Sequence, residues 1–416
     1  MGRHISRLKL LLLIMLLQPG YSWAGKVIVR PGNDRSLLKK AVQSVQPFDT
    51  VVVDGGVFKE GNIAIEKPLV LLGKNNPVLD GELKYQVLSV FASNVTISGL
   101  TLRNSGISSL DDLAGIKVYN ARNVVISGNK FENMFFAIFY QGCTSGRVLD
   151  NKIQAYSDNE VKSGNGIHCW KSDSMEITGN LISGQRDGIY FEFVSHTTIV
   201  DNICLGNLRY GLHFMFSHNN KYIGNTFQDN GAGVAVMYSR DVLMKGNVFS
   251  KNWGSSSFGL LIKEITNSQI IENLFEQNTS GIYMEGSSRN AIERNRFHGN
   301  GCALRIQASC DQNVVKTNNF VGNTFDVNTN GSLVMNSFSG NYWDKYEGYD
   351  LNRDLTGDIP YHPISLYSMI IEKMPASAIL LRSFLVVLLD RTERSIPSLT
   401  PENLVDEKPR MHPNVL

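Results

Sequence analysis

The stretch GLHFMFSHNNKYIGNTF, residues 211–227, contains the unit from which most of this chain is built. Apolar and polar residues alternate in two short runs, and the second run includes a Gly-Asn pair followed by a β-branched residue and an aromatic residue. Alternation with a period of two is typical of β-strands, because successive side chains point to opposite faces. The stretch therefore predicts two short strands joined by turns.

Comparable runs recur along the chain, each aligned on one asparagine: Asn129, Asn151, Asn180, Asn202, Asn225, Asn247, Asn273, Asn295 and Asn318. Their spacing is 22 or 23 residues, except for spacings of 29 and 26 that mark insertions near 154–163 and 253–258. A period near 22 with alternating apolar residues favours an all-β parallel β-helix over helical or leucine-rich repeats. We expect the asparagines to stack as a hydrogen-bonded ladder.

A second strand in each unit begins with Gly-Ile, Gly-Leu or a similar pair, and these strands share one register. Alternation predicts two inward columns. The first is Ile116, Ile138, Ile167, Ile189, Leu212, Val234, Leu260, Ile282 and Leu304, and the second is Val118, Tyr140, Cys169, Phe191, Phe214, Val236, Ile262, Met284 and Ile306.

The chain divides into four parts. Residues 1–24 read as a secretory signal, with basic residues before an apolar run and a small-x-small cleavage site. Residues 25–340 form the β-helix, including an N-terminal cap helix near 36–46 with Ser36 as its N-cap. Residues 341–375 form a closing loop and C-terminal cap, and 376–416 form an apolar helix and an extended tail.

The apolar segment within 376–390 is too short to span a bilayer and too apolar to stand alone in water. It therefore needs a partner surface, with these contact candidates: Leu380, Leu381, Phe384, Leu385 and Leu388. The tail from 391 to 413 has four prolines and no core periodicity, which is typical of an extended recognition or linker segment.

Removal of the signal leaves 37 Lys and Arg against 38 Asp and Glu, so there is no electrostatic case for nucleic-acid binding. The five cysteines include no CxxC pair, which disfavours a disulfide scaffold or a thiolate zinc site. We expect most of them to be buried as small apolar residues.

Metal-ligand candidates lie in the quoted stretch. Because Leu212 and Phe214 face inward, alternation turns His213 and Met215 outward, and Met237 lies one coil away from Met215. An imidazole with two thioethers suits Cu(I). Three readings stay open for this face: copper ligation, an apolar patch covered by a partner, or ordinary surface.

Two further sets of polar residues have spacings that are relevant to metal binding. His196 and His218 lie at corresponding turns of adjacent coils, which makes them a second, weaker candidate pair. Asp350, Asn352, Asp354 and Asp358 have part of the spacing of a calcium loop, but the glycine and the final glutamate are missing, so calcium is not expected.

Exported β-helix proteins often process polysaccharides, which requires carboxylates or other acid and base groups on neighbouring coils. Glu192 and Glu285 are four coils apart, so the sequence does not predict an enzyme. Trp170 and Tyr190 lie outward near His213, and together with Glu192 they are candidates for binding a partner. A polysaccharide-binding or polysaccharide-processing protein remains the alternative.

Several motifs resemble the NosD family of periplasmic nitrous oxide reductase maturation proteins. They are KPLVLLGKNNPVLDG (67–81), LDDLAGIKV (110–118), GNYWDKYEGYD (340–350) and ERSIPSLTPENLVDEKPRMHP (393–413). The resemblance implies a right-handed parallel β-helix without catalytic turnover, located in the periplasm and held at the inner membrane by its partner.

The same resemblance implies partners. They are an ABC transporter permease with its ATPase, a copper chaperone lipoprotein, and the apo nitrous oxide reductase whose copper-sulfide cluster is assembled. Residues 376–390 would then dock on the permease. No ligand motif is carried over, so the copper candidates rest on the strand pattern alone.

Overall fold

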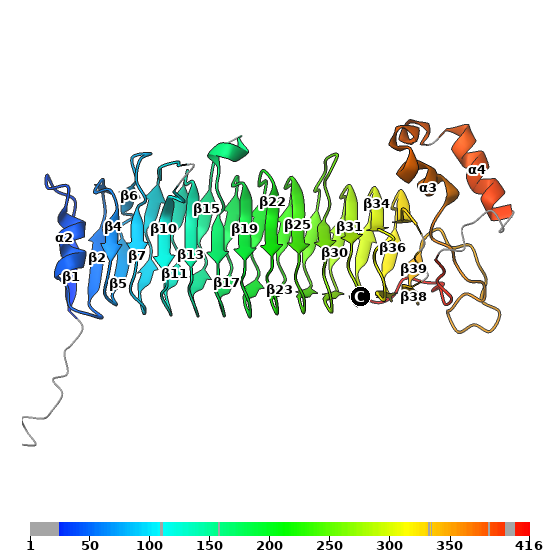
Figure 1. Cartoon of the computed structure of the whole chain (residues 1–416), viewed down its shortest axis with the longest axis horizontal. Helices are drawn as coiled ribbons and strands as arrows, with labels where there is room; N and C mark the ends of the chain where they lie inside the picture. The colour runs from blue at the N-terminus through cyan, green and yellow to red at the C-terminus, as the bar shows by residue number, and fades with distance from the viewer. Residues whose placement is uncertain are drawn as a thin grey trace, which may run out of the picture.

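The computed structural model describes residues 25–108, 111–156, 159–331, 333, 335–381, 383–395 and 404–416. The chain winds into a right-handed parallel β-solenoid in which each regular coil contributes one strand to each of three sheets (Figure 1). All paired strands run parallel, which confirms the predicted fold class. The predicted signal, residues 1–24, lies outside the described residues.

The three sheets run along the whole solenoid. Sheet A consists of β1 (Lys26–Val29), β2 (Thr50–Asp54), β5 (Val70–Lys74), β8 (Thr96–Ser98), β11 (Val125–Ser127), β14 (Arg147–Leu149), β17 (Glu176–Thr178), β20 (Thr198–Val200), β23 (Lys221–Ile223), β26 (Leu243–Lys245), β29 (Gln269–Ile271), β32 (Ala291–Glu293), β35 (Val314–Lys316) and β38 (Ser337–Ser339). Sheet B consists of β3 (Val57–Phe58), β6 (Val78–Asp80), β9 (Thr101–Arg103), β12 (Lys130–Glu132), β15 (Lys152–Gln154), β18 (Leu181–Ser183), β21 (Ile203–Leu205), β24 (Thr226–Gln228), β27 (Val248–Ser250), β30 (Leu274–Glu276), β33 (Arg296–His298), β36 (Asn319–Val321) and β39 (Tyr342–Trp343). Sheet C consists of β4 (Ile63–Ile65), β7 (Leu88–Val90), β10 (Ala114–Tyr119), β13 (Phe136–Gln141), β16 (Ile167–Trp170), β19 (Asp187–Glu192), β22 (Tyr210–Met215), β25 (Ala232–Met237), β28 (Leu260–Lys263), β31 (Ser280–Glu285), β34 (Cys302–Ile306) and β37 (Phe325–Asn328).

The two predicted inward columns are confirmed in sheet C. Leu212 pairs in register with Ile189 and Val234, and every member of both columns is buried. Sheet B supplies a third column of stacked rings whose centroids are 4.1 to 5.5 Å apart: Phe227, Phe249, Phe275, Phe297, Phe320 and Trp343. Tyr342 and Trp343 therefore form a last strand, which corrects their predicted place in a closing loop.

The predicted asparagine ladder is confirmed. The Asn225 side-chain amide donates to Asn247 Oδ1 at 3.1 Å, and the Asn225 backbone N–H donates to the same oxygen at 2.9 Å. The ladder continues to Asn341, whose amide donates to Asp406 Oδ2. A second ladder at another turn, not predicted from the sequence, consists of Asn207, Asn230, Asn252, Asn278, Asn300 and Asn323.

The N-terminal cap is α2 (Leu37–Ser44), which confirms the predicted helix. Ser36 lies at the N-cap position, as predicted, but its hydroxyl donates to Asp34 and makes no capping bond. The Glu60 carboxylate instead accepts the first helical N–H groups, from Leu38 and Lys39 at 2.9 and 2.8 Å.

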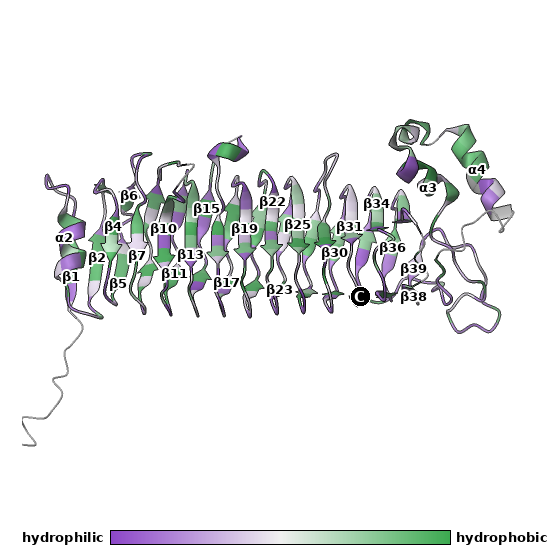
Figure 2. Cartoon of the chain, in the orientation of Figure 1, coloured by the Kyte–Doolittle hydropathy of each residue, from purple (hydrophilic) through white to green (hydrophobic). Residues whose placement is uncertain are grey.

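The C-terminal cap contains α3 (Leu366–Lys373), the 3₁₀ helix η2 (Pro375–Leu380) and α4 (Phe384–Ser395). The predicted apolar helix is present as α4, but it begins at Phe384 and not at 376, because residues 375–380 form a 3₁₀ segment before it. Figure 2 shows that α4 is hydrophobic in its first half, whereas its second half, from Asp390 on, is hydrophilic. The Arg305 guanidinium pairs with Glu372 at 2.8 Å and so holds α3 against sheet C.

The last residues return to the solenoid. Phe338 bridges to Asp406 and Tyr342 to Arg410, so residues 404–416 lie along the final coil. This segment is extended, as predicted, but it is packed and does not act as a linker. The reason is that a solenoid ends in unpaired strand edges, and the tail supplies partners for them.

Candidate functional site

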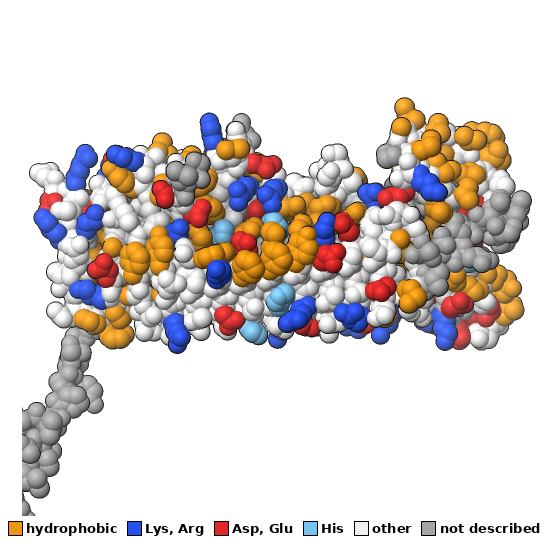
Figure 3. All heavy atoms as spheres, in the orientation of Figure 1, with side chains coloured by type: hydrophobic (Ala, Val, Ile, Leu, Met, Phe, Trp, Pro, Cys, Tyr) orange, Lys and Arg blue, Asp and Glu red, His pale blue; other side chains and the backbone are white. Residues whose placement is uncertain are grey.

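The candidate site is the outer face of sheet C over β16, β19, β22 and β25. Figure 3 shows hydrophobic side chains forming a band across this part of the solenoid. The strand register gives three parallel columns on this face. We name them the inner column (His168, Tyr190, His213, Ala235), the middle column (Trp170, Glu192, Met215, Met237) and the turn column (Lys171, Phe193, Phe216, Tyr238).

The inner column is closely packed. The His168 ring lies 4.7 Å from Tyr190, and Tyr190 lies 5.1 Å from His213 in an edge contact. Burial, with a smaller contribution from Arg186, lowers the pKa of His168 to about 3, so this imidazole is neutral at physiological pH. Burial likewise raises the pKa of Tyr190 to about 12.

His213 lies on the outer face, as alternation predicts, but it is only 3% exposed. Its ring lies 4.8 Å from Tyr210, and its Nδ1 lies 3.3 Å from Arg209 Nη2 and 3.7 Å from Asp187 Oδ2. Alternation predicts the face of the sheet on which a side chain lies. It does not predict that Arg209, from the preceding turn, and Tyr210, the first residue of β22, contact that side chain.

The tautomer of His213 depends on the neighbours of Nδ1, because Arg209 can donate to this atom and Asp187 can accept from it. If Arg209 donates to Nδ1, the ring proton is on Nε2, a buried atom without a hydrogen-bond partner in the described structure. A metal bound at Nε2 would have to displace that proton. With the proton on Nδ1, toward the Asp187 carboxylate, Nε2 is free to bind a metal, so His213 stays a predicted copper ligand.

Met215 and Met237 remain at the surface. They pair in register across β22 and β25, and both side chains are half-buried. The Tyr190 hydroxyl lies 3.7 Å from Met215 Sδ and donates to it. Two thioethers on neighbouring strands, which lie about 5 Å apart, are soft donors of the kind that Cu(I) accepts.

The predicted partner-binding residues belong to the same face. Trp170 is half-buried against the apolar cluster that contains Phe136 and Phe139. Lys171 Nζ lies 4.3 Å from the centroid of the Trp170 ring. Glu192 is half-exposed and pairs in register with Trp170 and Met215.

The turn column was missed from the sequence. Phe193, Phe216 and Tyr238 are 46%, 38% and 39% exposed, and their rings stack 5.3 and 5.0 Å apart. All three have φ near 50°, a conformation that costs an L-residue about 1–2 kcal/mol. At the same turn other coils place residues suited to it, such as Asn120 and Gly142.

In the second candidate pair for metal binding, the ring of His196 already has an aspartate partner. His196 and His218 lie on adjacent turns, as predicted, since the His196 N–H donates to the His218 carbonyl. The His196 ring, however, pairs with Asp173 at 2.8 Å. Within the described ranges, no three His, Cys, Asp or Glu side chains lie together as a metal site.

The five cysteines are all free and buried, as the sequence predicts. Burial raises the pKa of every one of these thiols. A thiol kept protonated in an apolar interior is a poor metal ligand. Soft ligation at this face therefore depends on the thioethers.

Comparison with known proteins places the chain. Residues 151–348 match the family described as "Periplasmic copper-binding protein (NosD)". A probable ABC transporter binding protein NosD from Pseudomonas aeruginosa is 30% identical over 372 residues, which cover 84% of this chain and 86% of that protein. The chain belongs to the NosD family. The protein of the same name from Stutzerimonas stutzeri is 28% identical over 375 residues, covering 85% of this chain and 84% of its own.

Solved structures show how widely this fold is used. The catalytic domain of an alpha-1,3-glucanase superposes on this NosD protein with a TM-score of 0.62 at 11% identity, covering 78% of this chain and 70% of the glucanase chain. The surface adhesin PfbA of Streptococcus pneumoniae gives 0.57 at 12%, covering 75% and 91%. Identities this low establish the fold alone.

Proposed function

We propose that this protein is a periplasmic accessory factor that works with an ABC transporter in assembling the copper-sulfide site of nitrous oxide reductase. Family membership carries the proposal, since the related proteins are named as probable ABC transporter binding proteins. The protein itself performs no turnover, and a partner subunit hydrolyses ATP. Copper is cargo in this scheme.

The transporter contact is proposed at α4. Phe384, Leu385 and Leu388 are 81%, 61% and 48% exposed, and Leu380 in η2 is 40% exposed. In the part of the chain that the structure describes, no helix is long and apolar enough to cross a bilayer. A short helix with exposed apolar side chains suits insertion between permease loops, so α4 would hold the protein at the inner membrane.

The outer face of sheet C is proposed to receive the copper chaperone lipoprotein and the apo-reductase. Its aromatic turn column supplies apolar contact area, and Met215 and Met237 supply soft ligands for Cu(I) in transit. Two thioethers hold Cu(I) weakly compared with thiolates, which suits an ion that is passed on.

The first experiment is deletion of the gene in its host, followed by purification of nitrous oxide reductase. A reductase that keeps its electron-transfer copper but lacks the copper-sulfide cluster, by absorption spectrum and copper content, supports the proposal. A reductase with both copper sites intact contradicts it.

A second experiment tests the thioethers. Met215→Leu with Met237→Leu should remove Cu(I) binding by the purified protein, measured by competition with a chromophoric Cu(I) chelator. Met335→Leu is the matched control, because Met335 is 65% exposed and lies near the C-terminal end of the solenoid. Equal Cu(I) affinity in the double variant and the control rejects the thioether site.

The alternative, a polysaccharide-binding or polysaccharide-processing protein, is less well supported by the same face. Phe193, Phe216 and Tyr238 stack with interplanar angles of 12° and 13°, so most of their ring faces cover each other. Sugars pack against open ring faces, and here mainly the ring edges remain for contact.

A further inference from the structure

Tyr190 lies between two of the three predicted copper ligands. It is part of β19, which pairs in register with β22, the strand that carries His213 and Met215. The Tyr190 ring contacts the His213 ring at a centroid distance of 5.1 Å, and the Tyr190 hydroxyl donates to Met215 Sδ at 3.7 Å. One side chain on the neighbouring strand thus touches both an imidazole and a thioether of the candidate site.

The Tyr190 ring is held by its neighbours on both sides. His168 of β16 contacts it at a centroid distance of 4.7 Å, and His213 contacts it from the opposite side. Tyr190 is half-buried, and the next residue, Phe191, is fully buried in the core and so fixes the backbone at this position. A phenol ring packed between two imidazoles has few rotamers open to it, so its hydroxyl keeps its direction toward Met215.

This hydrogen bond matters because methionine is a flexible ligand. Its unbranched side chain has three rotatable bonds, and a half-buried methionine such as Met215 would lose conformational entropy when its sulfur binds an ion. A sulfur that is already oriented in the free protein has less entropy to lose. A thioether sulfur has two lone pairs, so one can accept the Tyr190 O–H while the other remains available for a soft cation.

The second thioether differs from the first. Met237 pairs in register with Met215 and is half-buried like it, but in the described part of the chain its sulfur accepts no hydrogen bond. The pair therefore combines one oriented donor with one that is free to change rotamer. Such a donor set suits an ion that is taken up and then passed on.

We infer that Tyr190 is a positioning residue of the candidate copper site, and that its hydroxyl orients Met215 Sδ for binding of Cu(I). Tyr190 acts through Met215 and does not itself bind the ion. The inference rests on the proposed function, because it deepens the proposed use of Met215 and Met237 as ligands for copper in transit.

The first test needs no copper. The full mature chain is labelled with ¹³C at the methionine methyl groups, and the Met215 resonance is identified by its absence in Met215→Leu. In Tyr190→Phe, which keeps the ring, this resonance should shift toward that of Met335, which is 65% exposed. Tyr283→Phe is the matched control, because Tyr283 continues the inner column and is half-buried, but its hydroxyl donates to no sulfur in the described structure. An unchanged Met215 resonance in Tyr190→Phe overturns the inference.

The second test measures Cu(I) affinity by competition with a chromophoric chelator. Loss of one hydrogen bond that orients a ligand should weaken binding about three- to tenfold in Tyr190→Phe, with no change in Tyr283→Phe. Urea unfolding of both variants should match the wild type, which shows that the loss is not caused by unfolding. Equal affinity of Tyr190→Phe and wild type overturns the inference. A wild type that binds no Cu(I) instead rejects the proposed thioether site, and the methyl resonance, read without copper, keeps the two failures apart.

Discussion

Replacement of Asp406 by alanine tests how the end of the solenoid is closed. Both carboxylate oxygens are used: Oδ1 accepts from the N–H groups of Gly340 and Lys408, each at 3.1 Å. Oδ2 accepts from the Asn341 backbone N–H at 3.1 Å, the Asn341 amide at 2.9 Å and Trp343 Nε1 at 3.1 Å. Asp406 thus takes the place that the next asparagine would take in the ladder.

The expected loss of stability follows from the number of buried donors that lose their acceptor in Asp406→Ala. The Asn341 amide still donates to Val315 O, and Gly340 is half-exposed and open to water. The Asn341 backbone N–H and Trp343 Nε1 belong to residues that are 0% and 1% exposed, so two donors lose their partner. Each buried orphan donor costs about 1–3 kcal/mol, which gives about 2–6 kcal/mol in total. Release of residues 404–416 limits this cost, because water then reaches both donors.

Hydrogen exchange read by mass spectrometry is the suitable assay, because solenoids unfold locally and a global midpoint averages the effect. We expect Asp406→Ala to lose protection in 337–343 and 404–416, while the central coils stay unchanged. Asp406→Asn should lie between wild type and alanine, since one amide oxygen can still serve the three donors at the Oδ2 position. Unchanged protection at both ends in Asp406→Ala would refute the reasoning.

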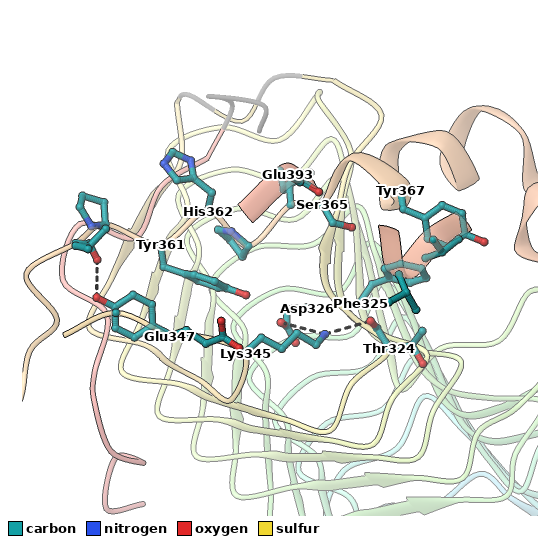
Figure 4. Close-up of a pocket in the computed structure, with 18 of the residues that line it drawn as sticks. Thr324, Phe325, Asp326, Lys345, Glu347, Tyr361, His362, Ser365, Tyr367 and Glu393 are labelled. Carbon is teal, nitrogen blue, oxygen red and sulfur yellow. Dashed lines mark hydrogen bonds and ion pairs between the residues drawn. The ribbon is translucent and has the colours of Figure 1, made fainter. Parts of the chain in front are cut away.

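Three further predictions concern the asparagine ladder that contains Asn225, the turn column and the buried carboxyl group of Asp326. Asn225→Ala should lower the free energy of unfolding by about 1–3 kcal/mol, because the Asn202 backbone N–H loses its acceptor, whereas the Asn202 amide still donates to Ile177 O. Urea titration measures this loss, and a loss below the error of the fit would contradict the role of the ladder. Phe216→Asn should keep the free energy of unfolding within about 1 kcal/mol of wild type, since asparagine tolerates the left-handed conformation and this offsets the lost ring stacking. Binding of the apo-reductase should weaken in pull-down titrations, and unchanged binding would count against that surface. Burial raises the folded-state pKa of Asp326, which pairs with Lys345 (Figure 4), to about 6, above its ordinary 3.8, so folding favours the protonated acid. The free energy of unfolding should therefore fall by about 3 kcal/mol as the pH rises from 4 to 6 and then level off. Urea titrations across this range should show no such decline for Asp326→Asn.

The repeat was readable from the sequence because its signals are local. A period of two tells which face of a strand a residue occupies, and a period near 22 tells which residues of successive coils become neighbours. Those two rules suffice for the inward columns and for the register of Met215 with Met237.

What was not readable depends on segments that meet from elsewhere in the chain. The burial of His213 has a more local cause, because Arg209 and Tyr210, just before it in the chain, contact its ring. The cap of α2 comes from Glu60, more than twenty residues downstream. The return of Asp406 to Asn341 joins residues 65 apart, and a proline-containing stretch without periodicity carries no local signal for such a contact.

One part of the site did carry a local signal. Phe193, Phe216 and Tyr238 each follow the last residue of a sheet C strand, a position at which other coils carry Asn120 and Gly142. Three successive coils thus carry an aromatic residue at a turn that favours Asn or Gly, which indicates that these side chains serve binding and not the geometry of the turn.

The solenoid fixes the distance between the two proposed contact regions, which are the outer face of sheet C and α4. From β22, in the middle of the outer face, to β37 at the last coil of sheet C is five steps in the strand order, or about 24 Å at the usual spacing of strands. Every step is hydrogen-bonded through three sheets, so the coils between move as one body. If α4 docks on a permease, a partner held at Met215 and Phe216 is kept clear of the membrane contact. Both proteins can then be bound at once, and movement of the permease is transmitted to the bound partner without unfolding the coils between them.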